Sequence, residues 1–87
     1  MTKDIEATLT DREDKYGSFW DVAKSSQKLQ EIIRKGKNFD KMSYAQREAC
    51  FMICNKISRM INGDPTYKDN AHDLAGYSRL IEKDLEE

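Results

Sequence analysis

The segment from residue 67 to residue 77, YKDNAHDLAGY, holds the side chains best suited to chemistry. Asp69 and Asp73 lie four residues apart in a pattern that indicates a helix. Asp69 falls in the first turn, where the helix dipole favours an acid without any further role. Asp73 falls one turn later, close to Gly76, where the missing side chain lets a ligand approach the backbone. We therefore predict a functional role for Asp73 first, and treat Asp69 as an acid of the helix start that can also belong to a site.

A second row of polar side chains follows one side of the helix predicted from Ser43 to about Asn62. At about 100° per residue this row contains Glu48, Met52, Asn55, Arg59 and Asn62, and Lys56 lies about 80° from Glu48. One interpretation is an ordinary solvated face. The other places the row opposite Asp73, so that Glu48 and Asp73 share a Mg²⁺ ion. Lys56 and Arg59 would then pair with the phosphate groups of a ligand.

Aromatic residues extend this candidate site. A flat apolar surface for a nucleotide base could come from Tyr16, Phe19, Trp20 and Tyr77. Each of these rings can also pack in a protein core. For Trp20 we favour core packing, because a large aromatic side chain contributes most when it is buried.

Helices must position these residues, because no stretch of the chain alternates with the period of a strand. A first helix is predicted over roughly residues 3–15, and Gly17 ends it by adopting a positive φ. Ser18 then caps a second helix. The core stripe of this helix consists of Phe19, Val22, Ser26, Leu29 and Ile33, and the helix ends before Gly36.

A linker at residues 38–42 leads to the third helix. Ser43 and Gln46 have the spacing of a capping box, and the apolar segment ACFMIC predicts a central position for this helix. Gly63 ends it. The last helix is predicted from about Lys68 to Leu85, with a core stripe of Leu74, Ser78, Ile81 and Leu85. The expected architecture is all-α, a small helical bundle of three main helices plus a short N-terminal helix.

Length and composition limit the function classes. The chain has 87 residues, which suits a single all-α domain over residues 1–87. A domain of this size has a thin core, so we expect a homo-oligomer in which a second chain covers apolar area. With 15 basic and 16 acidic residues the net charge is −1, and the bases are spread along the chain, which argues against binding duplex nucleic acid. No apolar segment approaches the roughly 20 residues of a membrane span, so we expect a soluble cytoplasmic protein without a membrane partner.

The two cysteines, Cys50 and Cys54, lie one helical turn apart in the apolar segment. A disulfide within one turn is geometrically poor, and two thiols without further ligands are a weak zinc signal. We therefore predict reduced thiols in the core, as suits a cytoplasmic protein.

Two sequence signatures resemble a known family. KYGSFW contains Tyr16 and Gly17, and KISRMINGDPTYKDNAHDLAGYSRL contains Lys56, Arg59, Asp69, Asp73, Leu74, Ala75 and Tyr77. Together they cover about residues 12–82 and resemble a family of small phage-encoded proteins. That family is similar to the domains called nucleotide-modification-associated and, more distantly, to the all-α nucleotide pyrophosphohydrolases of the MazG and dimeric dUTPase group. The resemblance implies an oligomeric all-α fold that binds nucleoside phosphates in a cleft between helices.

The chain departs from the metal-binding pattern of those hydrolases, in which Glu-x-x-Glu on one helix and Glu-x-x-Asp on the next hold Mg²⁺. Phe51 stands three residues after Glu48, and Asn70 stands three residues before Asp73. Only one carboxylate of each pair is therefore present, with Asp69 as the nearest further acid. A site of four acids is not expected in one chain, and bases retained beside lost ligands favour direct pairing with phosphates.

Three functions remain open. The first is a phage protein of the infected bacterial host's cytoplasm that captures a nucleotide or cyclic nucleotide without efficient hydrolysis, as a sponge that withdraws a signal of host defence. The second is a Mg²⁺-dependent nucleotide pyrophosphohydrolase with a reduced metal site, in which acids of a second subunit complement Glu48, Asp69 and Asp73. The third is a helical protein-interaction module, such as an inhibitor of a host enzyme. The expected ligand-binding residues are Tyr16, Gly17, Glu48, Lys56, Arg59, Asp69, Asp73 and Tyr77, and Glu48 and Asp73 are the expected metal ligands. Whether the protein is an enzyme stays undecided at this point.

Overall fold

The computed structural model describes residues 4–86, which form four α-helices and one short 3₁₀ helix, with no strand in that range. The elements are α1 (Ile5–Tyr16), α2 (Phe19–Arg34), the 3₁₀ helix Phe39–Lys41 in the linker, α3 (Tyr44–Asn62) and α4 (Lys68–Leu85). This confirms the all-α class and the three main helices with a shorter first one. Residues 1–3 and 87 of the predicted domain lie outside the described range, including the expected start of the first helix at residue 3.

The ends of the central helix form as the sequence predicts. The Ser43 hydroxyl accepts from the backbone N–H of Gln46 at 3.0 Å, and the Gln46 side chain accepts from the Ser43 N–H at 2.8 Å. The capping box is therefore confirmed, and Gly63 ends α3 as expected. Ser18 holds the N-cap position of α2, but its hydroxyl makes no capping bond, so only the position of that cap was predicted correctly.

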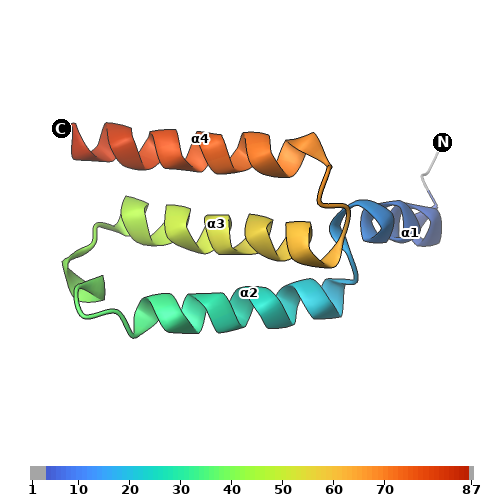
Figure 1. Ribbon diagram of the computed structural model, residues 1–87, viewed down its shortest axis with the longest axis horizontal. Coiled ribbons are helices and arrows are strands. Elements are labelled where there is room, and N and C mark those ends of the chain that lie inside the picture. The colour runs from blue at the N-terminus through green and yellow to red at the C-terminus, as the bar shows by residue number, and fades with distance from the viewer. Residues whose placement is uncertain (1–3, 87) are drawn as a thin grey trace.

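The helix α3 lies between α2 and α4, as Figure 1 shows. Both neighbours run antiparallel to α3 and pack along it, whereas α2 and α4 make almost no contact with each other within the described residues. The helix α1 projects past the end of this array where α2 begins and α3 ends (Figure 1). The bundle is therefore open, because its outer helices cover α3 on opposite sides and do not close around it.

The interior is small and partly polar. The buried apolar residues of the described range are Val22, Ala49 and Cys54, and the buried polar ones are Ser26, Lys56, Ser58 and Asn70. Each buried polar group needs a partner to offset the loss of water, and the Ser58 hydroxyl donates to the Cys54 carbonyl oxygen at 2.8 Å. Such a core supplies little apolar burial to hold the fold together.

The cysteines occupy the positions expected of them. Both are free thiols, with Cys54 buried and Cys50 half-buried. Burial, with a smaller contribution from Cys50, raises the pKa of the Cys54 thiol above its ordinary value. Cys54 is thus a packing residue and a poor nucleophile.

Three apolar residues expected in the core lie at the surface instead. Phe19 and Trp20 are 71% and 78% exposed and contact each other edge-to-face, with ring centroids 5.2 Å apart. Leu85, in the last turn of α4, is 66% exposed. The core assignments of Phe19, Trp20 and Leu85 were wrong because a stripe is buried only where a neighbouring element covers it, and this bundle is open.

The two helix breaks, which are Gly17 between α1 and α2 and Gly63 at the end of α3, pack against each other through their backbone atoms. Gly17 has a φ of 88°, and a Cβ added there would lie 2.4 Å from the Asn62 carbonyl oxygen. A Cβ added to Gly63 would lie 2.4 Å from the Tyr16 carbonyl carbon. Only glycine permits this approach at both positions, and the contact holds Tyr16 beside α3.

Candidate functional site

A groove of about 870 Å³ opens between α1, α2 and α3. Its charged residues are the bases Arg12 and Arg59 and the acid Glu13, its aromatic residues are Tyr16, Phe19 and Trp20, and its amides are Gln27, Gln30 and Asn55. The end of α1 supplies the first arginine and Tyr16, α2 supplies the exposed rings and two amides, and α3 supplies the rest. The groove thus combines positive charge, aromatic surface and hydrogen-bonding groups from three helices.

Two guanidinium groups flank one aromatic ring at the wall of this groove. The Cζ atoms of Arg12 and Arg59 lie 5.0 Å and 4.5 Å from the centroid of the Tyr16 ring. The Tyr16 ring in turn meets the Tyr67 ring nearly at right angles, with centroids 5.5 Å apart. Cation–π contacts of this kind position a guanidinium group without neutralising it.

Neither of these arginines has a carboxylate partner among residues 4–86, where the ion pairs involve other cations. The two guanidinium groups outnumber the single carboxylate of the groove, that of Glu13, so this wall is attractive to an anion. A planar guanidinium can bind a phosphate or carboxylate with two parallel hydrogen bonds.

Asn55 adds an unsatisfied acceptor to the groove. Its Oδ1 atom is buried and has no hydrogen-bond partner in the described part of the chain. Buried polar atoms are nearly always paired, so an unpaired one calls for an explanation. A donor group of a ligand in the groove would provide one.

The structure separates the residues that were predicted to form one site. Tyr16, Gly17 and Arg59 lie together in the lining of the groove. Asp73 and Tyr77 instead line a shallower hollow of about 470 Å³ along α4. The sequence pattern could not foresee this division, because it did not show on which side of α3 each neighbouring helix would pack.

Lys56 faces α4 and not the groove. Its Nζ atom lies 3.0 Å from Oδ2 of Asp73, and the two side chains are 9% and 42% exposed. The charge of Lys56 is therefore already balanced by Asp73. The predicted pairing of Lys56 with a ligand phosphate is corrected to a structural ion pair between α3 and α4, because the 80° offset from Glu48 turns this side chain toward the neighbouring helix.

Glu48 and Asp73 are not brought together. The Ser43 hydroxyl bonds Asp84 at 2.6 Å and Lys56 bonds Asp73, which sets the antiparallel register of α3 and α4. In this register Glu48 lies about seven residues along α4 from Asp73, roughly 10 Å at 1.5 Å per residue. Helical side chains lean toward their own N-terminus, which moves these two carboxylates further apart. A cation shared by Glu48 and Asp73 does not fit this arrangement.

A larger acidic metal site is also missing from the part of the chain that the structure describes. Within residues 4–86 no three His, Cys, Asp or Glu side chains gather closely enough to hold a metal ion. Glu48 is exposed on α3 and lines neither the groove nor the hollow.

Asp69 has a local partner at the start of α4. Its Oδ2 accepts a hydrogen bond from the Tyr67 hydroxyl at 3.0 Å. This bond, and secondly an interaction with the Tyr16 side chain, raises the pKa of Tyr67 from 10.0 to about 12. Asp69 therefore acts at the helix start, where it also steadies the ring that supports Tyr16.

We expect the fold to lose stability in alkali through Tyr67. The folded protein favours the neutral hydroxyl, so this contribution is complete below pH 10.0 and is lost as the pH rises toward about 12. Tyr67→Phe should therefore be less stable at neutral pH and should lose less stability between these two values. Thermal unfolding followed by circular dichroism across this range measures both effects, and parallel pH profiles for the two proteins would contradict the assignment.

Several residues of the groove were not predicted from the sequence, among them Arg12, Gln27 and Gln30. Arg12 carried a usable signal, because it lies four residues before Tyr16 and so shares one side of α1 with it. The two glutamines carried none, since only the position of α1 makes their side of α2 part of a groove.

The fold and the groove together define an all-α protein with an arginine- and aromatic-lined cleft beside an open three-helix array. Comparison of the chain with protein-family models, curated proteins and solved structures finds no match. Among the described helices, none combines the length and the apolar character needed to cross a membrane.

Proposed function

We propose that this protein binds a nucleotide in the groove between α1, α2 and α3. The observation that carries the proposal is the pair of guanidinium groups, from Arg12 and Arg59, held on the Tyr16 ring at 5.0 Å and 4.5 Å. Neither has a carboxylate partner within residues 4–86. Phosphate groups match such a pair in charge and in the geometry of their oxygens.

The remainder of the groove suits a nucleotide base. Trp20, 78% exposed beside Phe19, offers the kind of aromatic face on which a base stacks. The amides of Gln27 and Asn55 supply both donors and acceptors for the polar edges of a base, whereas the Gln30 amide already bonds Ser26 and Arg34. The volume of about 870 Å³ falls in the range of roughly 300–1,000 Å³ that is usual for small-molecule sites.

Capture without turnover is the mode of action that these residues favour. The groove holds two guanidinium groups, from Arg12 and Arg59, and one carboxylate, from Glu13. Guanidinium groups hold phosphate oxygens through paired hydrogen bonds, which suits tight capture of a nucleotide. The resemblance to small phage-encoded proteins adds the hypothesis that the captured molecule is a linear or cyclic nucleotide signal of a host defence system.

The proposal is tested by isothermal titration calorimetry with nucleoside mono-, di- and triphosphates and with cyclic nucleotides. We expect saturable binding of at least one of them, with no product detected by chromatography in the presence of Mg²⁺. Arg59→Ala should weaken the affinity by about tenfold to a hundredfold, the usual contribution of a hydrogen-bonded charge. Arg59→Lys should restore only part of it, because an ammonium group cannot form the paired hydrogen bonds of a guanidinium.

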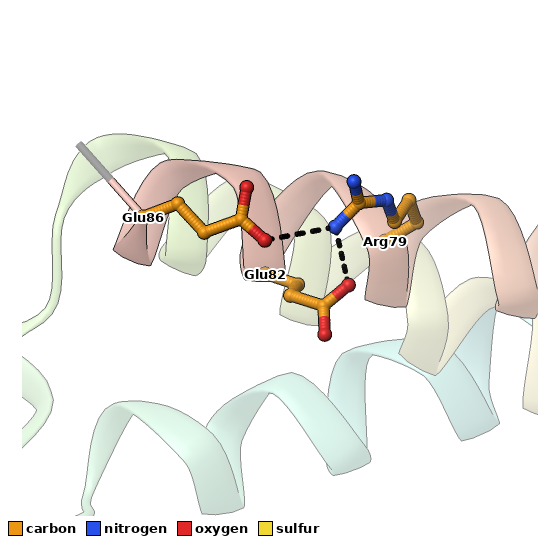
Figure 2. A network of polar contacts seen from close by, with 3 residues as sticks. All are labelled: Arg79, Glu82 and Glu86. Carbon is orange, nitrogen blue, oxygen red and sulfur yellow. Dashed lines mark hydrogen bonds and ion pairs between the residues drawn. The ribbon is translucent and has the colours of Figure 1, made fainter.

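Arg79 provides a matched control on α4. Figure 2 shows its side chain reaching along the helix to Glu82 and Glu86. Its Nη1 atom lies 3.1 Å from Oε1 of Glu86 and also bonds Glu82. Arg79→Ala therefore removes the same charge from the protein without touching the groove, and its affinity should match that of the wild type.

The outcomes separate the competing functions. Equal weakening by the Arg59 and Arg79 variants would indicate unspecific charge attraction, and failure to bind any of these nucleotides would contradict the proposal. Formation of pyrophosphate or monophosphate would replace capture by the pyrophosphohydrolase activity.

A further inference from the structure

Positive charge is concentrated in the segment that joins α2 to α3. Residues 34–47 contain five of the chain's 15 basic residues and a single acid, Asp40. The five bases are Arg34, Lys35, Lys37, Lys41 and Arg47. This segment thus has a net charge of +4, although the whole chain has a net charge of −1. Figure 1 shows the segment at the end of the helical array that lies away from α1.

Two of the five bases stack on a pair of phenylalanine rings. The Cζ atom of Arg34 lies 4.7 Å from the centroid of the Phe51 ring. The Cζ atom of Arg47 lies 4.7 Å from the centroid of the Phe39 ring. The two rings are neighbours, with centroids 6.1 Å apart. They therefore hold both guanidinium groups on one surface without neutralising them.

Both guanidinium groups keep their charge and some of their donors. No ion pair found within residues 4–86 includes Arg34 or Arg47. Arg34 donates to Oε1 of Gln30 at 3.0 Å, and Arg47 donates to the carbonyl oxygen of Asp40 at 3.1 Å. The Nε atom of Arg47 is buried and has no acceptor in the part of the chain that the structure describes. Each group can therefore still bind an anion.

One of the three lysines of this segment is neutralised and two are not. The Nζ atom of Lys35 lies 2.9 Å from Oε1 of Glu31. Lys37 and Lys41 are exposed and form no ion pair among the described residues. Four bases of the segment, two arginines and two lysines, are therefore available to a ligand.

The nearby acids do not cancel this charge. Asp40 and Glu48 are exposed and form no ion pair within residues 4–86, so two carboxylates accompany the four available bases. The described acids of the last turns of α4 lie on the other side of α3, where they bond Ser43 and Arg79 (Figure 1). The bases therefore remain in excess where α2 is joined to α3.

Tyr44 adds an exposed aromatic ring to these bases. It is the first residue of α3 and is 87% exposed. The Cζ atom of Arg47 lies 5.8 Å from the centroid of its ring. A ring this exposed contributes little to the core, but it offers a face on which a nucleic-acid base can stack.

We propose that single-stranded nucleic acid binds to the surface formed by Arg34, Lys37, Lys41, Tyr44 and Arg47, which we name the connection surface. A single strand presents a row of phosphates to cations and unpaired bases to aromatic rings, and the connection surface supplies both. A duplex fits less well, because its bases are already stacked on each other. The proposal does not depend on the nucleotide groove, because none of these five residues lines that groove.

Fluorescence anisotropy with labelled oligouridylate and oligothymidylate of about twelve nucleotides tests the proposal over salt concentrations from about 20 to 200 mM. We expect saturable binding that weakens as salt is added. Each phosphate contact on a single strand contributes about −0.7 to the slope of log K against log salt concentration. The four available bases should therefore give a slope of about −3.

Two variants of exposed residues separate the contributions of charge and stacking. Lys41→Ala should reduce the slope to about −2, because one phosphate contact is lost. Tyr44→Ala should leave the slope unchanged and weaken the affinity by roughly fivefold to a hundredfold, the usual contribution of one stacked base. Both side chains are exposed, so neither substitution acts by disrupting the core. Glu48→Gln should strengthen binding, since it removes a carboxylate that repels phosphates.

Lys68→Ala is the matched control. Lys68 is an exposed lysine at the start of α4, which lies at the other end of the array (Figure 1). Its removal should change neither the affinity nor the slope. Equal weakening by Lys41→Ala and Lys68→Ala would show unspecific charge attraction and overturn the proposal. Three other results would also overturn it: no binding at the lowest salt, an affinity that Tyr44→Ala leaves unchanged, or equal affinity for polyglutamate or for a duplex of the same length.

Discussion

Gly17→Ala will lower the free energy of unfolding by about 3–5 kcal/mol, combining a backbone conformation nearly restricted to glycine with a steric overlap. Gly17 has φ and ψ of 88° and 175°, which an L-residue rarely adopts. The added Cβ would also lie 2.4 Å from the carbonyl oxygen of Asn62, a backbone atom that cannot move aside alone. A chain of 87 residues has a total stability of about 4–13 kcal/mol, so this one methyl group removes a large part of it.

Urea unfolding at a fixed protein concentration measures this effect, and Gly76→Ala is its control. Gly76 lies in α4 with nothing within 4 Å of the position of an added Cβ. Alanine there should stabilise the protein by about 0.5–1 kcal/mol, because it reduces the freedom of the unfolded chain and favours the helix. A Gly17→Ala protein as stable as the wild type would show that the two helix breaks do not pack as described.

Gly17 has a structural role in addition to its place in the lining of the groove. The Asp64 N–H donates to the Lys15 carbonyl oxygen at 3.0 Å across the same contact. The break between α1 and α2 is therefore fastened to the turn between α3 and α4. Loss of this contact should release α1, and with it Arg12 and Tyr16, from the wall of the groove.

Asp73→Ala will destabilise the protein by about 1–3 kcal/mol, because it leaves the ammonium group of Lys56 buried without a partner. Removing one member of a fully buried ion pair costs about 3–5 kcal/mol, and the smaller figure reflects water around Asp73. The exposed fractions of 9% for Lys56 and 42% for Asp73 set this difference. Urea unfolding of the variant and the wild type measures it.

A substitution of Lys56, the ion-pair partner of Asp73, tests whether Asp73 has a structural role or belongs to a ligand site. Lys56→Met removes the buried charge while keeping most of the side-chain volume, so it should be nearly neutral or stabilising. It should also restore stability when combined with Asp73→Ala, since no charge is then left unpaired. If Asp73→Ala abolished nucleotide binding while leaving stability unchanged, Asp73 would belong to a binding site and the structural assignment would fail.

The sequence by itself determined the helices of this protein and their ends. The capping box of Ser43 and Gln46, the positive φ at Gly17 and the stop at Gly63 depend on neighbours within a few residues. The sequence also predicted the central position of α3, because a helix that is apolar on most sides needs neighbouring helices on more than one side.

Only part of the candidate site could be predicted from the sequence. Tyr16, Gly17 and Arg59 were identified and do line one groove, but Lys56 and Asp73 bond each other elsewhere and Glu48 meets neither. A helical count gives the angle of each side chain around its own axis and says nothing about which neighbour lies at that angle. The groove itself depends on where α1 projects, and its contacts join residues far apart in the chain.

Burial was decided by the tertiary structure alone. The same periodicity that placed Val22 in the core also placed Phe19 and Leu85 there, yet these two are exposed. The periodicity identifies the apolar positions of a helix. Whether those side chains are buried depends on a neighbouring element that packs over them. In this chain α2 and α4 pack on opposite sides of α3, so Ile57 and Ile61, which lie on a third side of that helix, stay exposed.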